Sequence, residues 1–210
     1  MTQTKGPSRQ LKIIAAGAVA IVGLIGLTAV LLNNANNDEG ETVEYGDVTV
    51  IGEALPVYDA DTQDPATGMD APEIEGFSVD SEPIEIIPNG HPKMIVFLAH
   101  WCEHCQAEVP RVQEWLDEGN LPEDIEVWSI ATSTDEGQPN YPPSAWLRRE
   151  GWTPELMMDN QRNSAANAYG LSGFPFWVIV DRDGKVVARN AGQTDIAQVE
   201  AWALEITETS

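Results

Sequence analysis

The only two cysteines of this 210-residue chain are Cys102 and Cys105, in the run Trp101-Cys102-Glu103-His104-Cys105. Two thiols at this spacing can close a small disulfide and reopen it, which is redox chemistry. Half of a zinc site has the same spacing, so the cysteine pair alone does not decide between the two. The elements around the pair must separate these interpretations.

The flanking segments predict a strand and a helix. The apolar run 94–98 before the pair is typical of a buried central strand, predicted at 93–98, and residues 102–118 after it have helical spacing, with Pro110 inside. A strand followed by a CxxC that opens a helix places the first thiol at the amino end of that helix. The unpaired N–H groups there favour the thiolate, which is the nucleophile of disulfide exchange. We therefore expect Cys102 to lie at an exposed helix start.

The remaining segments predict an α/β fold, with a mixed central sheet flanked by helices. The order is a βαβ unit followed by ββα, and the turn Asp181-Arg182-Asp183-Gly184 joins the last two strands as a hairpin. Strands are predicted at 48–51, 84–87, 93–98, 125–131, 156–159, 176–180 and 185–191, and helices at 102–118, 144–150 (capped by Ser144), 160–169 and 194–208.

The amino-terminal part has the pattern of one transmembrane helix. Residues 13–32 carry no charge, and at about 1.5 Å per residue they reach roughly the 30 Å of a bilayer core. Lys5, Arg9 and Lys12 precede the span and acidic residues follow it, so the remainder of the chain is expected outside the cytoplasm. A cleaved signal peptide is the alternative. No cysteine follows the span, which argues against a lipid anchor on cysteine.

We therefore expect four parts: a cytoplasmic amino terminus at 1–12, a transmembrane anchor at 13–32, an acidic linker and extension at 33–67, and the catalytic domain at 68–210. The expected location is the cell membrane, single-pass, with an extracytoplasmic domain. Beyond residue 37, eight basic residues stand against 34 acidic ones, a net charge of −26. Such a charge favours solubility and argues against nucleic acid or an anionic lipid surface as a partner.

The chain resembles thioredoxin-fold proteins of the membrane-anchored TlpA/ResA type over about residues 68–209. The resemblance rests on the Trp-Cys-x-x-Cys run together with four further motifs. These are Ala71-Pro72, Glu108-Val109-Pro110, Gly173-Phe174-Pro175-Phe176, and the Asp-x-Asp-Gly-Lys hairpin at 181–185.

The resemblance implies roles for the residues around the thiols. Cys102 is expected to attack the substrate and Cys105 to resolve the mixed disulfide, so that a Cys102–Cys105 disulfide forms and opens. Pro175 is expected to be a cis-proline that faces this disulfide. Phe174, before it, is expected to bind a substrate segment through its backbone.

Four neighbours are expected to bind substrate or tune the reaction. Trp101 is expected to cover the edge of the site, with pure packing as the alternative. His104, when protonated, would stabilise the thiolate, whereas Glu103 would disfavour it; solvent exposure without effect is the alternative for both. Glu108 is expected to exchange a proton with Cys105, its pKa raised by burial; an exposed helix carboxylate is the alternative.

These patterns predict a membrane-anchored extracytoplasmic thiol–disulfide oxidoreductase, with a role in cytochrome c maturation or oxidative folding. Its substrates would be protein thiols or disulfides and its partner a membrane or extracytoplasmic redox protein, with no cofactor beyond its own disulfide and no metal. The alternatives are zinc or copper handling by the two cysteines with His100 and His104, and a non-catalytic interaction module. The direction of exchange stays open.

Overall fold

Strand β4 (Lys93–Leu98) is the centre of a five-stranded sheet in the computed structural model, which describes residues 44–208. The strand order is β6-β5-β4-β7-β8. β5 (Glu126–Ala131) runs parallel to β4, and β6 (Glu155–Met158) runs parallel to β5. β7 (Phe176–Val180) pairs antiparallel with β4, and β8 (Val186–Ala191) with β7. The predicted mixed sheet is confirmed.

The sheet has a hydrophobic core on each face because successive side chains of a strand point to opposite sides. In β4, Met94 and Val96 belong to one core, whereas Ile95 and Phe97 belong to the other. A strand that is buried on both faces reads as a continuous apolar run rather than an alternating one. This explains why residues 94–98 carry no polar side chain.

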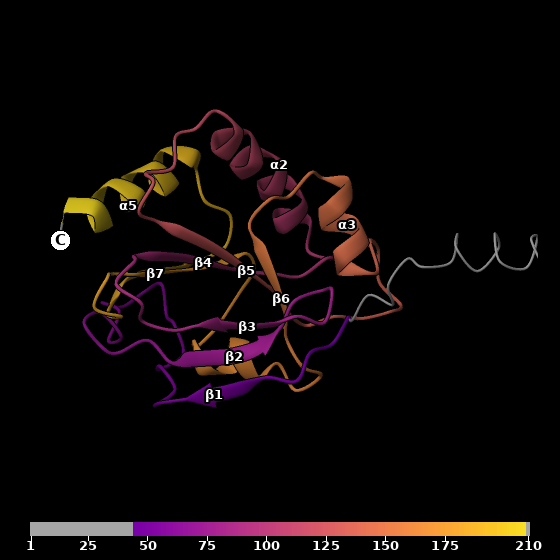
Figure 1. Ribbon diagram of the computed structural model, residues 1–210, viewed down its shortest axis with the longest axis horizontal. Coiled ribbons are helices and arrows are strands. Elements are labelled where there is room, and N and C mark those ends of the chain that lie inside the picture. The colour runs from indigo at the N-terminus through magenta and orange to yellow at the C-terminus, as the bar shows by residue number, and fades with distance from the viewer. Residues whose placement is uncertain (1–43, 209–210) are drawn as a thin grey trace, which may run out of the picture. The chain divides into compact units, whose positions relative to one another are not determined.

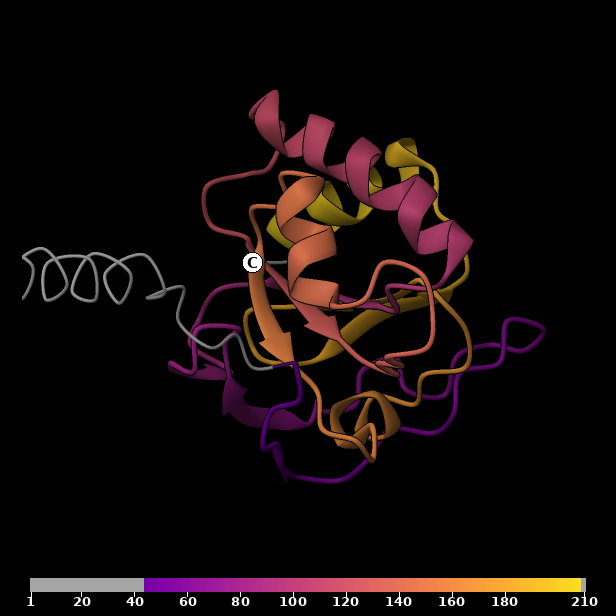
Figure 2. The same ribbon diagram turned by 90° about the vertical axis from the view of Figure 1, so that its right-hand side faces the viewer.

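Helices cover both faces of the sheet. α2 (Glu103–Asp117), α3 (Pro143–Arg149) and α5 (Ile196–Glu208) pack on the first core, and Figure 1 shows them together above the sheet. The short α4 (Ser164–Ala168) packs on the second core and lies on the opposite side in Figure 2. The predicted helices are confirmed, with shifted ends. α3 has Pro142 rather than Ser144 at its N-cap.

A second sheet, which the sequence analysis did not anticipate, lies below the first in Figure 1. It is antiparallel, in the order β1-β2-β3, and consists of β1 (Thr49–Ile51), β2 (Glu73–Phe77) and β3 (Pro83–Ile86). β2 was not predicted because its sequence, Glu-Ile-Glu-Gly-Phe, has few strand-forming residues; only Ile74 and Gly76 are buried in it.

The domain begins earlier than the expected boundary at residue 68. The Leu55 N–H donates to the Ala168 carbonyl at 2.8 Å, and the Tyr58 N–H donates to the Gly170 carbonyl at 2.9 Å. Leu55 and Ala66 are buried in the second core. The second half of the segment predicted as linker and extension is therefore part of the domain.

The predicted anchor at 13–32 and the start of the linker lie outside the described residues. Among residues 44–208, no helix combines the length and apolar character that crossing a bilayer requires.

Candidate active site

Cys102 is the N-cap residue of α2, directly after the central strand. Its N–H donates to the Ala99 carbonyl at 3.0 Å, and its own carbonyl accepts the Gln106 N–H at 3.0 Å, which closes the first helical turn. The position at the helix start agrees with the sequence analysis, and both cysteines are free thiols. The expected exposure is wrong, since Cys102 is only 9% exposed.

Cys105 lies one turn further along α2 and has no exposed surface. Burial, the largest cause, raises the pKa of its thiol strongly, because a thiolate loses its hydration there. A hydrogen bond from the Ala99 backbone, the second-largest cause, lowers this pKa, whereas the charge and the hydrogen bond of Cys102 and the charge of Glu108 raise it further. Cys105 is therefore the thiol that keeps its proton.

Glu108 is buried at 1% exposure, so the alternative of an exposed helix carboxylate is wrong. One carboxylate oxygen accepts the Trp177 indole N–H at 2.6 Å, and the other accepts the Thr194 backbone N–H at 2.5 Å. Burial raises the pKa of Glu108, although both hydrogen bonds and the charges of Arg111 and His104 oppose this. A carboxyl group with a raised pKa beside a buried thiol can take and return a proton.

Trp101 and Phe174 come together at the edge of the site. Their rings meet edge to face, with centroids 5.6 Å apart, and the Trp101 indole N–H donates to the Ser133 carbonyl at 2.8 Å. The Phe174–Pro175 peptide bond is cis, which is the geometry expected from the sequence. The proposed substrate contacts of these residues remain a prediction.

The two residues between the cysteines are both exposed on the first turn of α2. The charge of His104 lowers the pKa of Glu108, so this side chain acts on the buried carboxyl as well as lying next to the thiols. The tuning role of Glu103 stays a prediction, with a solvated residue at the helix start as its alternative.

Sequence reasoning missed two residues that the fold brings to the site, and it considered His100 only as a possible metal ligand. Trp177 on β7 and Thr194 after β8 hold Glu108, although they lie 69 and 86 positions away along the chain. His100 is buried at 1% exposure, and its ring nitrogens contact Pro139 and Asp135. The only signal in the sequence was a tryptophan, which carries an N–H donor, in a strand whose other side chains have no polar group.

The metal alternative requires His100 as a ligand, but both of its ring nitrogens already have hydrogen-bond partners. Within residues 44–208, no group of three or more histidine, cysteine, aspartate or glutamate side chains is arranged to hold a metal ion.

Part of the sequence is similar to that of known proteins. The chain is 25% identical over 150 residues to "Thiol-disulfide oxidoreductase ResA" of Bacillus thuringiensis (strain Al Hakam), which covers 70% of this chain and 83% of that protein. It is 28% identical over 90 residues to the protein of the same name from Geobacillus thermodenitrificans (strain NG80-2), covering 43% of this chain and 48% of that one.

Solved structures show the same fold. StoA from Bacillus subtilis matches with a TM-score of 0.53 and 16% identity, over 66% of this chain and 98% of that one. A thiol:disulfide interchange protein from Chlorobium tepidum TLS matches with a TM-score of 0.55 and 24% identity, over 67% and 97%. The model of the thioredoxin-like domain family matches residues 79–207. Since this match spans more than half of the chain, the protein belongs to the thioredoxin-like domain family.

Proposed function

We propose that the protein is a membrane-anchored extracytoplasmic thiol–disulfide oxidoreductase that acts on protein substrates through Cys102 and Cys105. The observation that carries the proposal is the asymmetry of the two thiols. Cys102 is at a helix start, whereas Cys105 is fully buried, with a raised pKa, beside the buried carboxyl of Glu108. The names of the ResA relatives describe the same class of reaction in those proteins.

The first step of reduction is attack by Cys102. Its thiolate bonds to one sulfur of a substrate disulfide, and the other substrate sulfur leaves as a thiolate that takes a proton from water. The amino end of α2 stabilises the attacking anion through the unpaired N–H groups of its first turn. The product is a mixed disulfide between Cys102 and the substrate.

The second step resolves the mixed disulfide. Glu108 takes the proton of Cys105, and the Cys105 thiolate attacks the Cys102 sulfur. The Cys102–Cys105 disulfide forms, and the substrate sulfur leaves and takes up a proton. In total, two electrons and two protons pass to the substrate. Run in reverse, the same steps oxidise a substrate dithiol, and no cofactor beyond the disulfide enters either direction.

Two replacements test this assignment. Cys102→Ser removes the attacking thiol and is expected to abolish exchange with insulin, read as the turbidity of the reduced chains. Cys105→Ser removes the resolving thiol and is expected to trap covalent mixed disulfides, visible on a non-reducing gel. Unaltered activity of either variant refutes the proposal.

The direction of exchange is measured by the reduction potential of the pair. A value near about −270 mV indicates a reductant and one near about −120 mV a strong oxidant. A reductant fits the maintenance of reduced cysteines for cytochrome c maturation, whereas an oxidant fits oxidative folding. In either case, a membrane or extracytoplasmic redox partner must reset the pair.

A further inference from the structure

His100 is a buried imidazole two residues before Cys102 that the exchange steps do not use. Its Nδ1 lies 2.7 Å from the Pro139 carbonyl oxygen, and its Nε2 accepts the Asp135 backbone N–H at 3.1 Å. A carbonyl oxygen only accepts and a backbone N–H only donates. The ring is therefore neutral, with its proton on Nδ1, and bridges two points of the same loop.

This loop, residues 133–142, connects β5 to α3 and contacts the segment before Cys102 at further places. The Trp101 indole N–H donates to Ser133, as described above, and the Asn140 side-chain amide donates to the His100 carbonyl at 3.4 Å. At its start, the Ser133 N–H donates to the Asn163 side-chain oxygen at 3.0 Å. The loop is thus held against the two residues next to the attacking thiol.

The outer side of the loop is exposed, although the Tyr141 ring there also meets the His100 ring edge to face, with centroids 5.9 Å apart. Asp135, Glu136, Gln138 and Tyr141 are exposed there, whereas the His100 ring beneath them is buried. On the other flank of Trp101, its ring contacts Phe174, next to the cis peptide bond. The loop, the indole and the Phe174 segment therefore form a continuous rim beside Cys102.

We infer that loop 133–142 is one wall of the surface that binds the polypeptide substrate, and that His100 is the positioning residue that holds this wall. The inference rests on the proposed function and deepens it. A polypeptide must contact the rim around Cys102 to present its disulfide, whereas a small disulfide needs access only to the sulfur. The two kinds of substrate therefore report on the loop and on the thiols separately.

The test compares insulin with the small neutral reagent dithiodipyridine on the full-length protein. His100→Leu removes both ring hydrogen bonds and is expected to raise KM for insulin about thirtyfold, the equivalent of about 2 kcal/mol, because both bonds hold the loop in place. The reaction of Cys102 with dithiodipyridine and the reduction potential are expected to stay near their wild-type values. His100→Gln, whose amide carries a donor beside an acceptor, is expected to recover most of the insulin KM.

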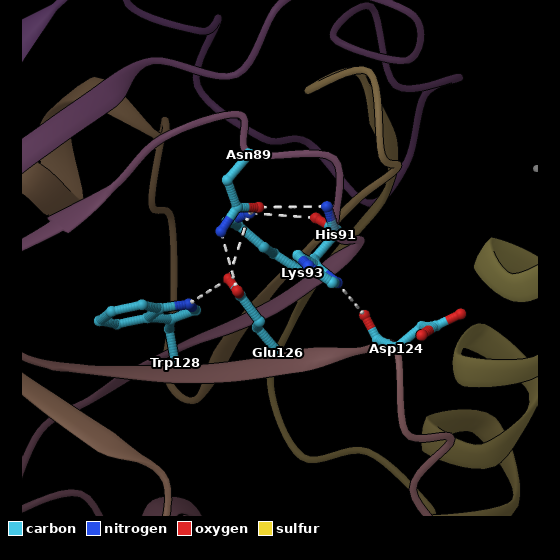
Figure 3. A network of polar contacts seen from close by, with 6 residues as sticks. All are labelled: Asn89, His91, Lys93, Asp124, Glu126 and Trp128. Carbon is cyan, nitrogen blue, oxygen red and sulfur yellow. Dashed lines mark hydrogen bonds and ion pairs between the residues drawn. The ribbon is translucent and has the colours of Figure 1, made fainter.

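Two further comparisons separate the loop from general effects on the fold. His91 lies just before the opposite end of β4, where its Nδ1 contacts the Asp124 carbonyl at 3.3 Å (Figure 3). His91→Leu therefore serves as the matched control and is expected to leave the reactions with both substrates unchanged.

Asp135→Pro deletes the backbone N–H that donates to His100 Nε2 while His100 stays in place, whereas Asp135→Ala keeps this N–H. Only the proline variant is expected to raise the insulin KM, and this pair decides the question if His100→Leu does not fold.

The outcomes are distinguishable. If the wild type reacts with neither substrate, the proposed function itself fails. If the wild type is active but the His100→Leu and Asp135→Pro variants keep the wild-type insulin KM, only the wall is refuted. An equal loss with both substrates, or a shifted reduction potential, also overturns the inference, because His100 would then act on the thiols.

Discussion

Glu108 shows how much of the proposed chemistry rests on one buried side chain. A carboxylate at 1% exposure is costly unless its oxygens are hydrogen-bonded, and both are. The two donors are an indole and a backbone N–H, neither of which can accept the proton of Cys105. Of these three groups, Glu108 is therefore the one that can accept the proton of Cys105.

We expect Glu108→Gln to slow the resolving step about a hundredfold, since general base catalysis typically contributes this much or more. The rate of release of the mixed disulfide, followed in a single turnover, measures the effect. Glu114→Gln replaces an exposed carboxylate on the same helix and is the control. A resolving step of normal speed in the Glu108 variant would contradict the assignment of a proton carrier.

The same replacement has a signature in its pH dependence. Because burial raises the pKa of Glu108 above its ordinary value of 4.5, the folded protein binds this proton more tightly than the unfolded chain does. The stability that Glu108 contributes is therefore lost as the pH rises above 4.5. A plot of unfolding free energy against pH should fall more steeply there for the wild type than for Glu108→Gln. The resolving step of the wild type should also slow on acidification through the raised pKa, whereas that of the variant should not.

At the scale of elements, Arg189 on β8 ties the segment before β2 to the main sheet. Its guanidinium pairs with Asp64 through two contacts of 2.9 and 2.5 Å and donates to the Pro56 and Tyr169 carbonyls. The Arg189 side chain is fully buried, and that of Asp64 is 13% exposed. An ion pair whose guanidinium is buried and makes four hydrogen bonds can hold a loop that has no regular secondary structure of its own.

Arg189→Leu is expected to cost about 3–5 kcal/mol of unfolding free energy, because the half-buried Asp64 and the Pro56 and Tyr169 carbonyls all lose their partner. Urea denaturation measures this loss, and Arg148→Leu, at an exposed position on α3, is the control. If the pair is the cause, adding Asp64→Asn to the Arg189 variant should recover part of the loss. If Arg148→Leu lowered the unfolding free energy as much as Arg189→Leu does, the ion pair with Asp64 would not be the cause of the loss.

The pair also makes a contribution that depends on pH. Burial alone would raise the pKa of Asp64, but the hydrogen bonds of Arg189 and of the Ala66 N–H, with the charge of Arg189, hold it below 3.8. A lowered pKa stabilises the fold above pH 3.8, and this stability is lost as the pH falls through the lowered value. The wild type should therefore lose more stability on acidification than the Arg189→Leu variant.

At the scale of the whole molecule, the redox domain and the predicted anchor are separate parts of the chain, and the described residues 44–208 belong to one compact unit. We expect the full chain to stay in the membrane pellet after alkaline carbonate extraction, because of the apolar span 13–32. The fragment 44–210 is expected in the supernatant with its thiol exchange intact. Recovery of the uncleaved, full-length chain in the supernatant would contradict the prediction that residues 13–32 anchor it.

Local patterns in the sequence were sufficient for the central part of this protein. A continuous apolar run must become a strand buried on both faces, and the CxxC after it must open a helix, because both patterns act on residues a few positions apart. The cis geometry before Pro175 was expected from the resemblance, and the mixed character of the main sheet from the order of the predicted elements. The sheet β1-β2-β3 did not, because its middle strand has little strand propensity and is held by its neighbours.

Only the tertiary structure decided what surrounds the two sulfurs. The burial of Cys102, the donors that Trp177 and Thr194 supply to Glu108, and the bridge from His100 to loop 133–142 all join residues far apart in the sequence. No periodicity records such contacts, since they arise where separate elements pack together. The sequence by itself determined which atoms can react, whereas their pKa values, exposure and neighbours depend on burial, which exists only after the chain has folded.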